Sequence, residues 1–109
     1  MANTFKLKTK ANVGVTTVGI YTAPAATTTV VIGITMSNTS GSGVNVGVGI
    51  TRAGTTEDVK LLKNAPIPQG SSLEFMAGNK IVLEETDTVT VDSDTINSVD
   101  AALTIMEIT

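Results

Sequence analysis

Hydrophobic and polar residues alternate with a period of two along most of this chain. Within residues 28–37, every second position is a large apolar residue, namely Val30, Ile32, Ile34 and Met36. Such alternation is typical of a β-strand with one buried face. The commonest residues, Thr and Val, are β-branched and favour an extended backbone. We therefore predict a strand over residues 28–37, with these four side chains facing the core.

A second strand is predicted directly after the turn-forming segment 38–43. In residues 44–50, apolar positions again alternate with polar residues or glycine, and we expect the two strands to pair as a β-hairpin. Gly47 and Gly49 would lie on the outward face of the second strand. A missing side chain weakens a strand unless another group approaches closely, so we predict that both glycines contact a partner.

The remaining sequence indicates shorter strands and no helix. Segment 64–70 contains two prolines, which lack the ladder donor, so a loop is expected there. Gly78 and Asn79 are predicted to form the turn of a further hairpin. The inward face of the last strand is expected to carry Val99, Ala101, Leu103 and Ile105. Further strands are predicted at 13–22, 58–63, 73–77, 80–83, 88–91 and 99–105.

Strands at this spacing predict one all-β domain, a single antiparallel β-sandwich of seven to nine strands. The strand order is either jelly-roll or immunoglobulin-like, and the pattern does not choose between them. The length of 109 residues fits one domain. We place the sandwich at residues 13–109, preceded at 1–12 by a basic N-terminal arm or edge strand.

Composition excludes several classes of function. The chain has no Cys and no His, so thiol chemistry, Ser-His catalysis and the commonest metal ligand are absent. No cofactor is expected, because no glycine-rich segment has the context of a nucleotide loop. The net charge of −3 disfavours direct nucleic-acid binding, and no aliphatic run is long enough to span a membrane.

Charge is distributed unevenly along the chain. Residues 1–56 have a net charge of +4 and residues 57–109 a net charge of −7. In the basic half, Lys6, Lys8 and Lys10 lie at alternate positions and would share one side of an extended segment. They either guard an exposed strand edge or form an arm that contacts another subunit, where charge steers association.

The acidic residues of the second half permit two weaker chemical interpretations. Glu84 and Asp87 resemble the paired carboxylates of glycoside cleavage, but the chain has only three aromatic residues and we predict no enzyme. Asp92, Asp94 and Asn97 supply hard oxygens within one turn and are a weak candidate for calcium. Solvated turn residues explain these acids better.

Several segments resemble the small virion structural proteins of tailed bacteriophages, especially marine ones. The resemblance covers roughly Val18–Ile108. It rests on four runs: IYTAPAATTTVVIG at 20–33, LLKNAPIPQGSSL at 61–73, KIVLE at 80–84 and DTVTV at 87–91.

The resemblance implies a non-enzymatic β-sandwich that acts in many copies in a virion made in the bacterial cytoplasm. Capsid decoration is the expected role, and a neck, tail or fibre component is the alternative. It implies viral capsid or tail proteins as partners, with self-association as a trimer or ring. A glycan- or receptor-binding module, using loops 38–43 and 92–98, is the runner-up.

Overall fold

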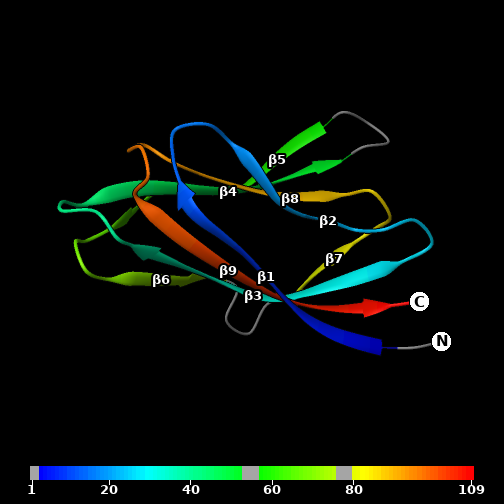
Figure 1. Ribbon diagram of the computed structural model, residues 1–109. Coiled ribbons are helices and arrows are strands. Elements are labelled where there is room, and N and C mark those ends of the chain that lie inside the picture. The colour runs from blue at the N-terminus through cyan, green and yellow to red at the C-terminus, as the bar shows by residue number, and fades with distance from the viewer. Residues whose placement is uncertain (1–2, 53–56, 76–79) are drawn as a thin grey trace.

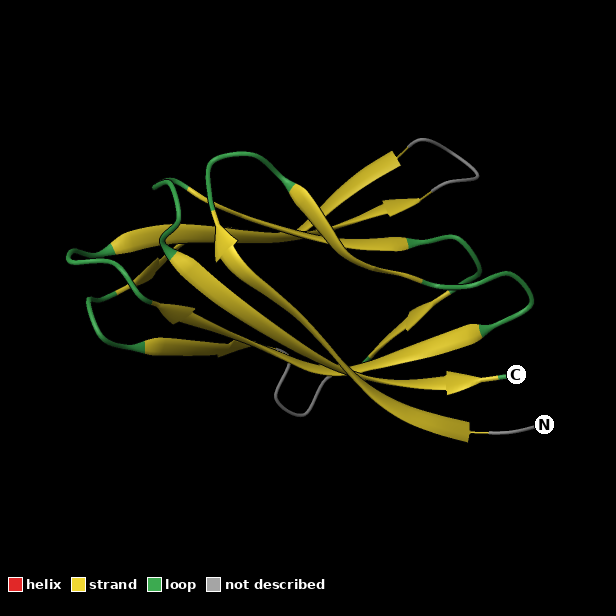
Figure 2. Ribbon diagram, viewed as in Figure 1, coloured by secondary structure: helices red, strands yellow, loops and turns green. Residues whose placement is uncertain are grey.

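The computed structural model describes residues 3–52, 57–75 and 80–109. That part of the chain contains nine strands and no helix (Figure 2). Accordingly, it offers no helical segment of the length and hydrophobicity needed to cross a bilayer. The strands are β1 (Asn3–Val13), β2 (Val18–Thr22), β3 (Thr28–Asn38), β4 (Val44–Arg52), β5 (Glu57–Ile67), β6 (Ser72–Phe75), β7 (Ile81–Leu83), β8 (Thr88–Ser93) and β9 (Val99–Ile108).

The strands form two antiparallel sheets that face each other, which confirms the predicted all-β sandwich (Figure 1). One sheet has the order β1-β9-β3-β6, with β7 also paired to β3, and the other has the order β2-β8-β4-β5. Both β6 and β7 run antiparallel to β3, so they form one interrupted strand along its edge. Counted this way, eight strands form two four-stranded layers in jelly-roll order, which decides between the two predicted topologies.

The core is built from alternate residues of both sheets, as the pattern predicts. On β9, Val99, Ala101, Leu103 and Ile105 are at most 3% exposed, which confirms the predicted inward face of this strand. The inward alternation continues to Glu107, which is also buried. Every buried side-chain nitrogen or oxygen among the described residues has a hydrogen-bond partner.

Neither predicted hairpin forms. Strands β3 and β4 lie in opposite sheets, because segment 39–43 crosses from one layer to the other; β4 pairs with β5 and β8 instead. The predicted turn at Gly78 and Asn79 lies outside the described residues, as does the end of the predicted strand 73–77. The strands on either side of it do not pair with each other, since both pair with β3.

A β-bulge changes the predicted inward face of β3. The register with β9 shifts between Val31 and Gly33. Thr29 and Val31 are buried before the bulge, and Ile34 and Met36 are buried after it. Because the extra residue reverses the alternation, Val30 and Ile32 turn away from the core, contrary to prediction.

Two further predicted boundaries are wrong. The predicted strand 13–22 is divided, because a turn at residues 14–17 carries the chain from β1 in one sheet to β2 in the other. The first part of predicted loop 64–70 belongs to β5, where Pro66 pairs with Asn45. β5 is the edge strand of its sheet, where a proline loses no ladder hydrogen bond on the open side.

Candidate functional site

Strand β1 is the long edge strand of the five-stranded sheet and carries the three predicted contact lysines. It pairs with β9 on one side only, with Lys6 opposite Ile105, Lys8 opposite Leu103 and Lys10 opposite Ala101. Residues opposite each other in an antiparallel pair point to the same face. The lysines therefore share one side, and that side faces the other sheet at the margin of the sandwich.

Lys6 belongs to a polar cluster that joins the two sheets. Its Nζ lies 2.9 Å from Oε1 of Glu107 on β9. Tyr21, on β2 of the opposite sheet, donates a hydrogen bond of 2.6 Å to Oε2 of Glu107. The Tyr21 hydroxyl also lies 2.8 Å from Oγ1 of Thr29 on β3. Side chains from four strands thus form one polar cluster around the buried carboxylate of Glu107, which joins the two sheets beside β1.

The surroundings shift the pKa of both acidic groups in this cluster. Burial, reinforced by the Glu107 carboxylate, raises the pKa of Tyr21 to about 12. The hydrogen bond from Tyr21, followed by that from Lys6, lowers the pKa of Glu107. Tyr21 is thereby kept as a donor and Glu107 as a charged acceptor near neutral pH.

The other two lysines have different surroundings. Lys8 Nζ lies 6.0 Å from the centre of the Tyr21 ring, at the outer limit of a cation–π contact. Lys10 is exposed and forms no ion pair with any residue that the structure describes. Among the described residues, Lys6 is held in an ion pair and Lys8 lies over the Tyr21 ring, whereas Lys10 has neither contact and is the most available to a partner.

The sequence contained a signal for this cluster that the predictions above did not use. The inward alternation of the last strand runs on past Ile105 to Glu107, and an acid at an inward position requires a partner. Tyr21 is the single tyrosine and one of three aromatic residues. Because these two residues are 86 positions apart, no local pattern could pair them.

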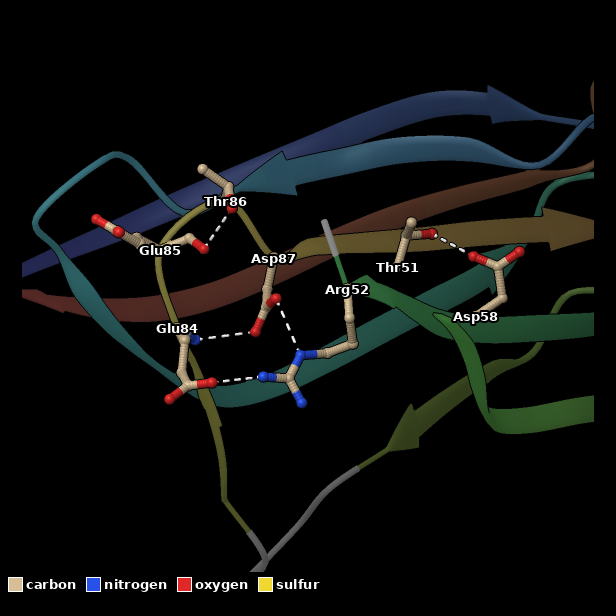
Figure 3. A network of polar contacts seen from close by, with 7 residues as sticks. All are labelled: Thr51, Arg52, Asp58, Glu84, Glu85, Thr86 and Asp87. Atoms are coloured by element: carbon tan, nitrogen blue, oxygen red, sulfur yellow. Dashed lines mark hydrogen bonds and ion pairs between the residues drawn. The ribbon is translucent and has the colours of Figure 1, made fainter. Parts of the chain in front are cut away.

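The candidate hydrolytic acids, Glu84 and Asp87, lie in loop 84–87 between β7 and β8, where they form hydrogen bonds and ion pairs with their neighbours (Figure 3). Asp87 accepts a hydrogen bond of 3.0 Å from Nε of Arg52 and another of 3.0 Å from the backbone N–H of Glu84. Arg52 also forms an ion pair with Glu84, and Glu85 accepts a hydrogen bond from the backbone of Ala26. These acids fasten loop 84–87 to β4 and to the 23–27 connection.

The candidate calcium ligands also hold turns. Asp92 accepts a hydrogen bond of 2.9 Å from Oγ1 of Thr17, and Asp94 accepts one of 3.1 Å from the backbone of Asn45. Asn97 has a left-handed backbone with φ of 50° and follows Asp94 in the tight turn between β8 and β9. Within residues 3–52, 57–75 and 80–109, no three acidic side chains gather in a metal-binding arrangement.

Loop 38–43, a candidate for glycan contact, is organised by one buried amide. Asn38 donates to the carbonyl oxygens of Ser42 and Ile67, at 2.8 and 3.0 Å. Its Oδ1 accepts from both the backbone and the hydroxyl of Ser40. The Asn38 side chain is therefore fully used by the loop and the end of β5, and it has no hydrogen bond left for a ligand.

The space beside Gly47 and Gly49 is filled by atoms of this same chain. A Cβ on Gly47 would lie 2.5 Å from Oδ1 of Asp92, and a Cβ on Gly49 would lie 2.9 Å from the carbonyl oxygen of Val59. Both glycines are buried. The close approach thus comes from neighbouring strands β8 and β5, and it explains these glycines without a second subunit.

Comparisons with known proteins give the fold. No protein-family model matches the chain, and no curated protein matches it. Among solved structures, a chain of Bacillus endospore appendages, described as disulfide-linked pili, has a TM-score of 0.57 and 16% identity. The match covers 99% of this chain and 87% of that one. This likeness shows a shared fold.

Two structures with lower scores are a phage capsid protein and a virus-like particle. A pentameric capsid protein from metagenomic phage sequences has a TM-score of 0.42 and 18% identity, covering 94% of this chain and 59% of that chain. The extra small virus particle of the prawn Macrobrachium rosenbergii gives a TM-score of 0.39 and 13% identity, with 97% and 80% covered. Their scores are too low to add to the assignment of the fold.

Proposed function

We propose that this chain is a non-enzymatic structural subunit of a virion, most specifically a capsid decoration protein of a tailed phage. It would bind the shell in many copies, as trimers or as a ring, with a neck, tail or fibre position as the alternative. The observation that carries the proposal is the combination of a jelly-roll with a long edge strand, β1, that pairs on one side only and exposes Phe5 and Leu7 on the outer face of its sheet.

The polar groups support a structural role over a catalytic one. Glu84 and Asp87 are tied to Arg52, and Asp92 and Asp94 hold turns, so the acids of the second half fasten loops. The jelly-roll architecture is common in viral capsid and lectin domains. The chain has no Cys, so its contacts with neighbours would be non-covalent, unlike those named for the pili.

Lys10 provides the sharpest test of a charged contact made by β1. Replacing all three lysines with Glu would place a new carboxylate beside Glu107, because Lys6 pairs with it. The single substitution Lys10→Glu avoids this, and Lys63→Glu on the exposed part of β5 is its charge-matched control.

The experiment is to sediment particles from a producing bacterial culture and to measure the copies of this chain per particle by mass spectrometry. We expect the wild type and Lys63→Glu to co-sediment with particles and Lys10→Glu to be depleted several-fold. Recovery of the wild-type chain only among free proteins would overturn the proposal. Equal occupancy of all three chains would remove Lys10 from the contact.

A glycan array, with and without calcium, separates this role from receptor binding. We expect no binding, because the side-chain amide of Asn38 is fully used in hydrogen bonds to this chain and the carboxylate of Asp94 accepts one from the backbone of Asn45. Specific glycan binding that is lost on altering loop 38–43 or 92–98 would favour a receptor-binding module. Hydrolysis that is lost on changing Glu84 or Asp87 would contradict the non-enzymatic role.

A further inference from the structure

The outer faces of the two sheets differ in chemistry. On the four-stranded sheet, Gly47, Gly49 and Thr51 of β4 lie opposite Asp92, Thr90 and Thr88 of β8, so the centre of that face consists of small or polar residues. On the five-stranded sheet, the outward positions include large apolar residues on β1, β9, β3 and β7. We call this second surface the apolar face.

The strand register aligns four apolar side chains in one row across the apolar face. Phe5 on β1 lies opposite Met106 on β9, Met106 lies opposite Val30 on β3, and Val30 lies opposite Val82 on β7. Phe5 is 69% exposed and Val82 is 59% exposed, at the two ends of the row. A solvated row of this kind is unusual, because exposed apolar clusters generally mark contact sites.

Neighbouring positions enlarge the apolar face. Leu7, two residues from Phe5, is 64% exposed, and Ile108 lies two residues beyond Met106 on the same side of β9. The bulge in β3 turns Ile32 to this side as well. The fold therefore directs an additional isoleucine outward at a position where unbroken alternation would have buried it.

Charge limits the kind of partner that fits. Among the described strand positions that point outward from this sheet, Glu74 and Asp100 are the charged ones, and both lie away from the Phe5 row. The lysines of β1 point to the opposite side. The described strand positions of this face offer no cation to a nucleic acid or an anionic membrane, and the nearest lysine, Lys80, precedes β7. An uncharged surface could cover the Phe5 row without burying an unpaired charge.

The area of the apolar face suits a second copy of this chain. β1 has 11 residues, which span about 36 Å at about 3.3 Å per residue, and four strands span about 19 Å at about 4.8 Å each. The product is about 700 Å², close to the roughly 800 Å² that each partner buries in a standard stable interface. The Phe5 row alone is smaller, so the contact would extend beyond it over the neighbouring outward positions, with Glu74 and Asp100 left at its margin.

Pairing between two β1 edges is a less favourable way to join two copies. Antiparallel pairing of β1 with another β1 would place Lys6, Lys8 and Lys10 beside the same lysines of the second copy. Like charges on opposite positions of paired strands are destabilising, and inward-pointing charges are a known protection of sheet edges. The face, rather than the edge, is therefore available for self-association.

We propose that two copies of this chain pack apolar face against apolar face about a two-fold axis. In such an arrangement each copy uses the same residues, and two sheets stack about 10 Å apart with their strands nearly aligned. The contact deepens the proposed function by naming one neighbour of the subunit, and it exists for the isolated chain whether or not a virion is its destination.

The test measures the molar mass of the purified chain by sedimentation equilibrium from about 1 μM to 1 mM. The wild type should be a dimer or an even multiple of the monomer. Phe5→Glu and, separately, Val82→Glu should halve that mass or raise the dissociation constant at least about tenfold, since each buries a charge in the contact. Two separate variants guard against one of them failing to fold, which circular dichroism would reveal.

Ile96→Glu is the matched control, because Ile96 is 72% exposed in the turn between β8 and β9, far from the Phe5 row. It should self-associate like the wild type. A monomeric wild type at 1 mM, an odd-numbered oligomer unchanged by both variants, or equal weakening by Ile96→Glu would overturn the proposed contact. Hydrogen exchange gives a further test. If the backbone amides on the open edge of β1 became protected on association, the copies would be joined by edge pairing and the proposed contact would be overturned.

These results are separable from the proposed function. A wild-type monomer that still co-sediments with virions would refute the two-fold contact and leave the virion role standing. A wild type that forms the dimer but is absent from virions would support the two-fold contact and refute the virion role.

Discussion

Tyr21 allows the buried cluster to be measured directly, because it is the single tyrosine in a chain without tryptophan. Its side chain lies between the sheets, and its hydroxyl donates a 2.6 Å hydrogen bond to Glu107. Burial and then the Glu107 carboxylate raise the pKa of Tyr21 from 10.0 to about 12. The near-ultraviolet absorbance of tyrosinate should therefore rise with a midpoint near pH 12 in the folded protein and near pH 10 in denaturant.

The difference between the two midpoints gives the contribution of protonated Tyr21 to the free energy of unfolding. A shift of about two pKa units in Tyr21 corresponds to roughly 3 kcal/mol. Because the folded pKa of Tyr21 lies above its unfolded value, this stabilisation is fully present below about pH 10 and is lost as the pH rises towards 12. A Tyr21→Phe variant should lack this component of the alkaline decline in the free energy of unfolding.

Glu107→Gln is the informative perturbation, because it removes the charge next to the Tyr21 hydroxyl but keeps an oxygen that accepts a hydrogen bond. The pKa of Tyr21 should fall below 12 yet stay above 10, since burial remains. Lys10→Gln, at an exposed lysine, is the control and should leave the midpoint unchanged. A folded wild type whose Tyr21 titrates near pH 10, or a Glu107→Gln variant with an unchanged midpoint, would refute the reasoning.

Three further outcomes are expected in denaturant unfolding. Because the pKa of Glu107 is lowered in the folded state, the stabilisation by its carboxylate is present above about pH 4.5 and is lost at lower pH. The free energy of unfolding of Glu107→Gln should therefore fall less than that of the wild type between about pH 7 and pH 3. Gly49→Ala should cost about 1–3 kcal/mol, because its Cβ would meet the backbone carbonyl of Val59, whereas Gly41→Ala, in open space, should change stability by less than about 1 kcal/mol; equal effects would contradict the packing. Leu103→Ala, at a fully buried position, should cost about 3 kcal/mol, and a loss below about 1 kcal/mol would argue against the core assignment.

The alternation of residues was sufficient to predict the fold class because it reports burial of one face, which each strand obeys locally. It correctly gave an antiparallel sandwich and the inward face of β9 from Val99 to Ile105. The same signal failed at Ile32, where a bulge shifts the alternation by one residue without an obvious mark in the sequence.

Strand pairing was harder to predict because it depends on residues far apart in the chain. Turn-rich segment 38–43 has the composition of a hairpin, but in the jelly-roll it crosses between the layers. Pro66 indicates an edge or a loop equally well, and the position of β5 at the sheet margin decides for the edge. The three lysines were correctly expected on one side of an extended segment, yet the partner of Lys6 is a buried acid of its own chain.

The position of β9 between β1 and β3 has a consequence for how the protein acquires its structure. Asn3 pairs with Ile108, so β1 leaves the ribosome about a hundred residues before the strand that becomes its neighbour. Until β9 is synthesised, β1 exposes both of its edges, and β3 lacks one side of its ladder. Contacts between such distant segments slow folding, and removing β9 would separate β1 from its sheet altogether.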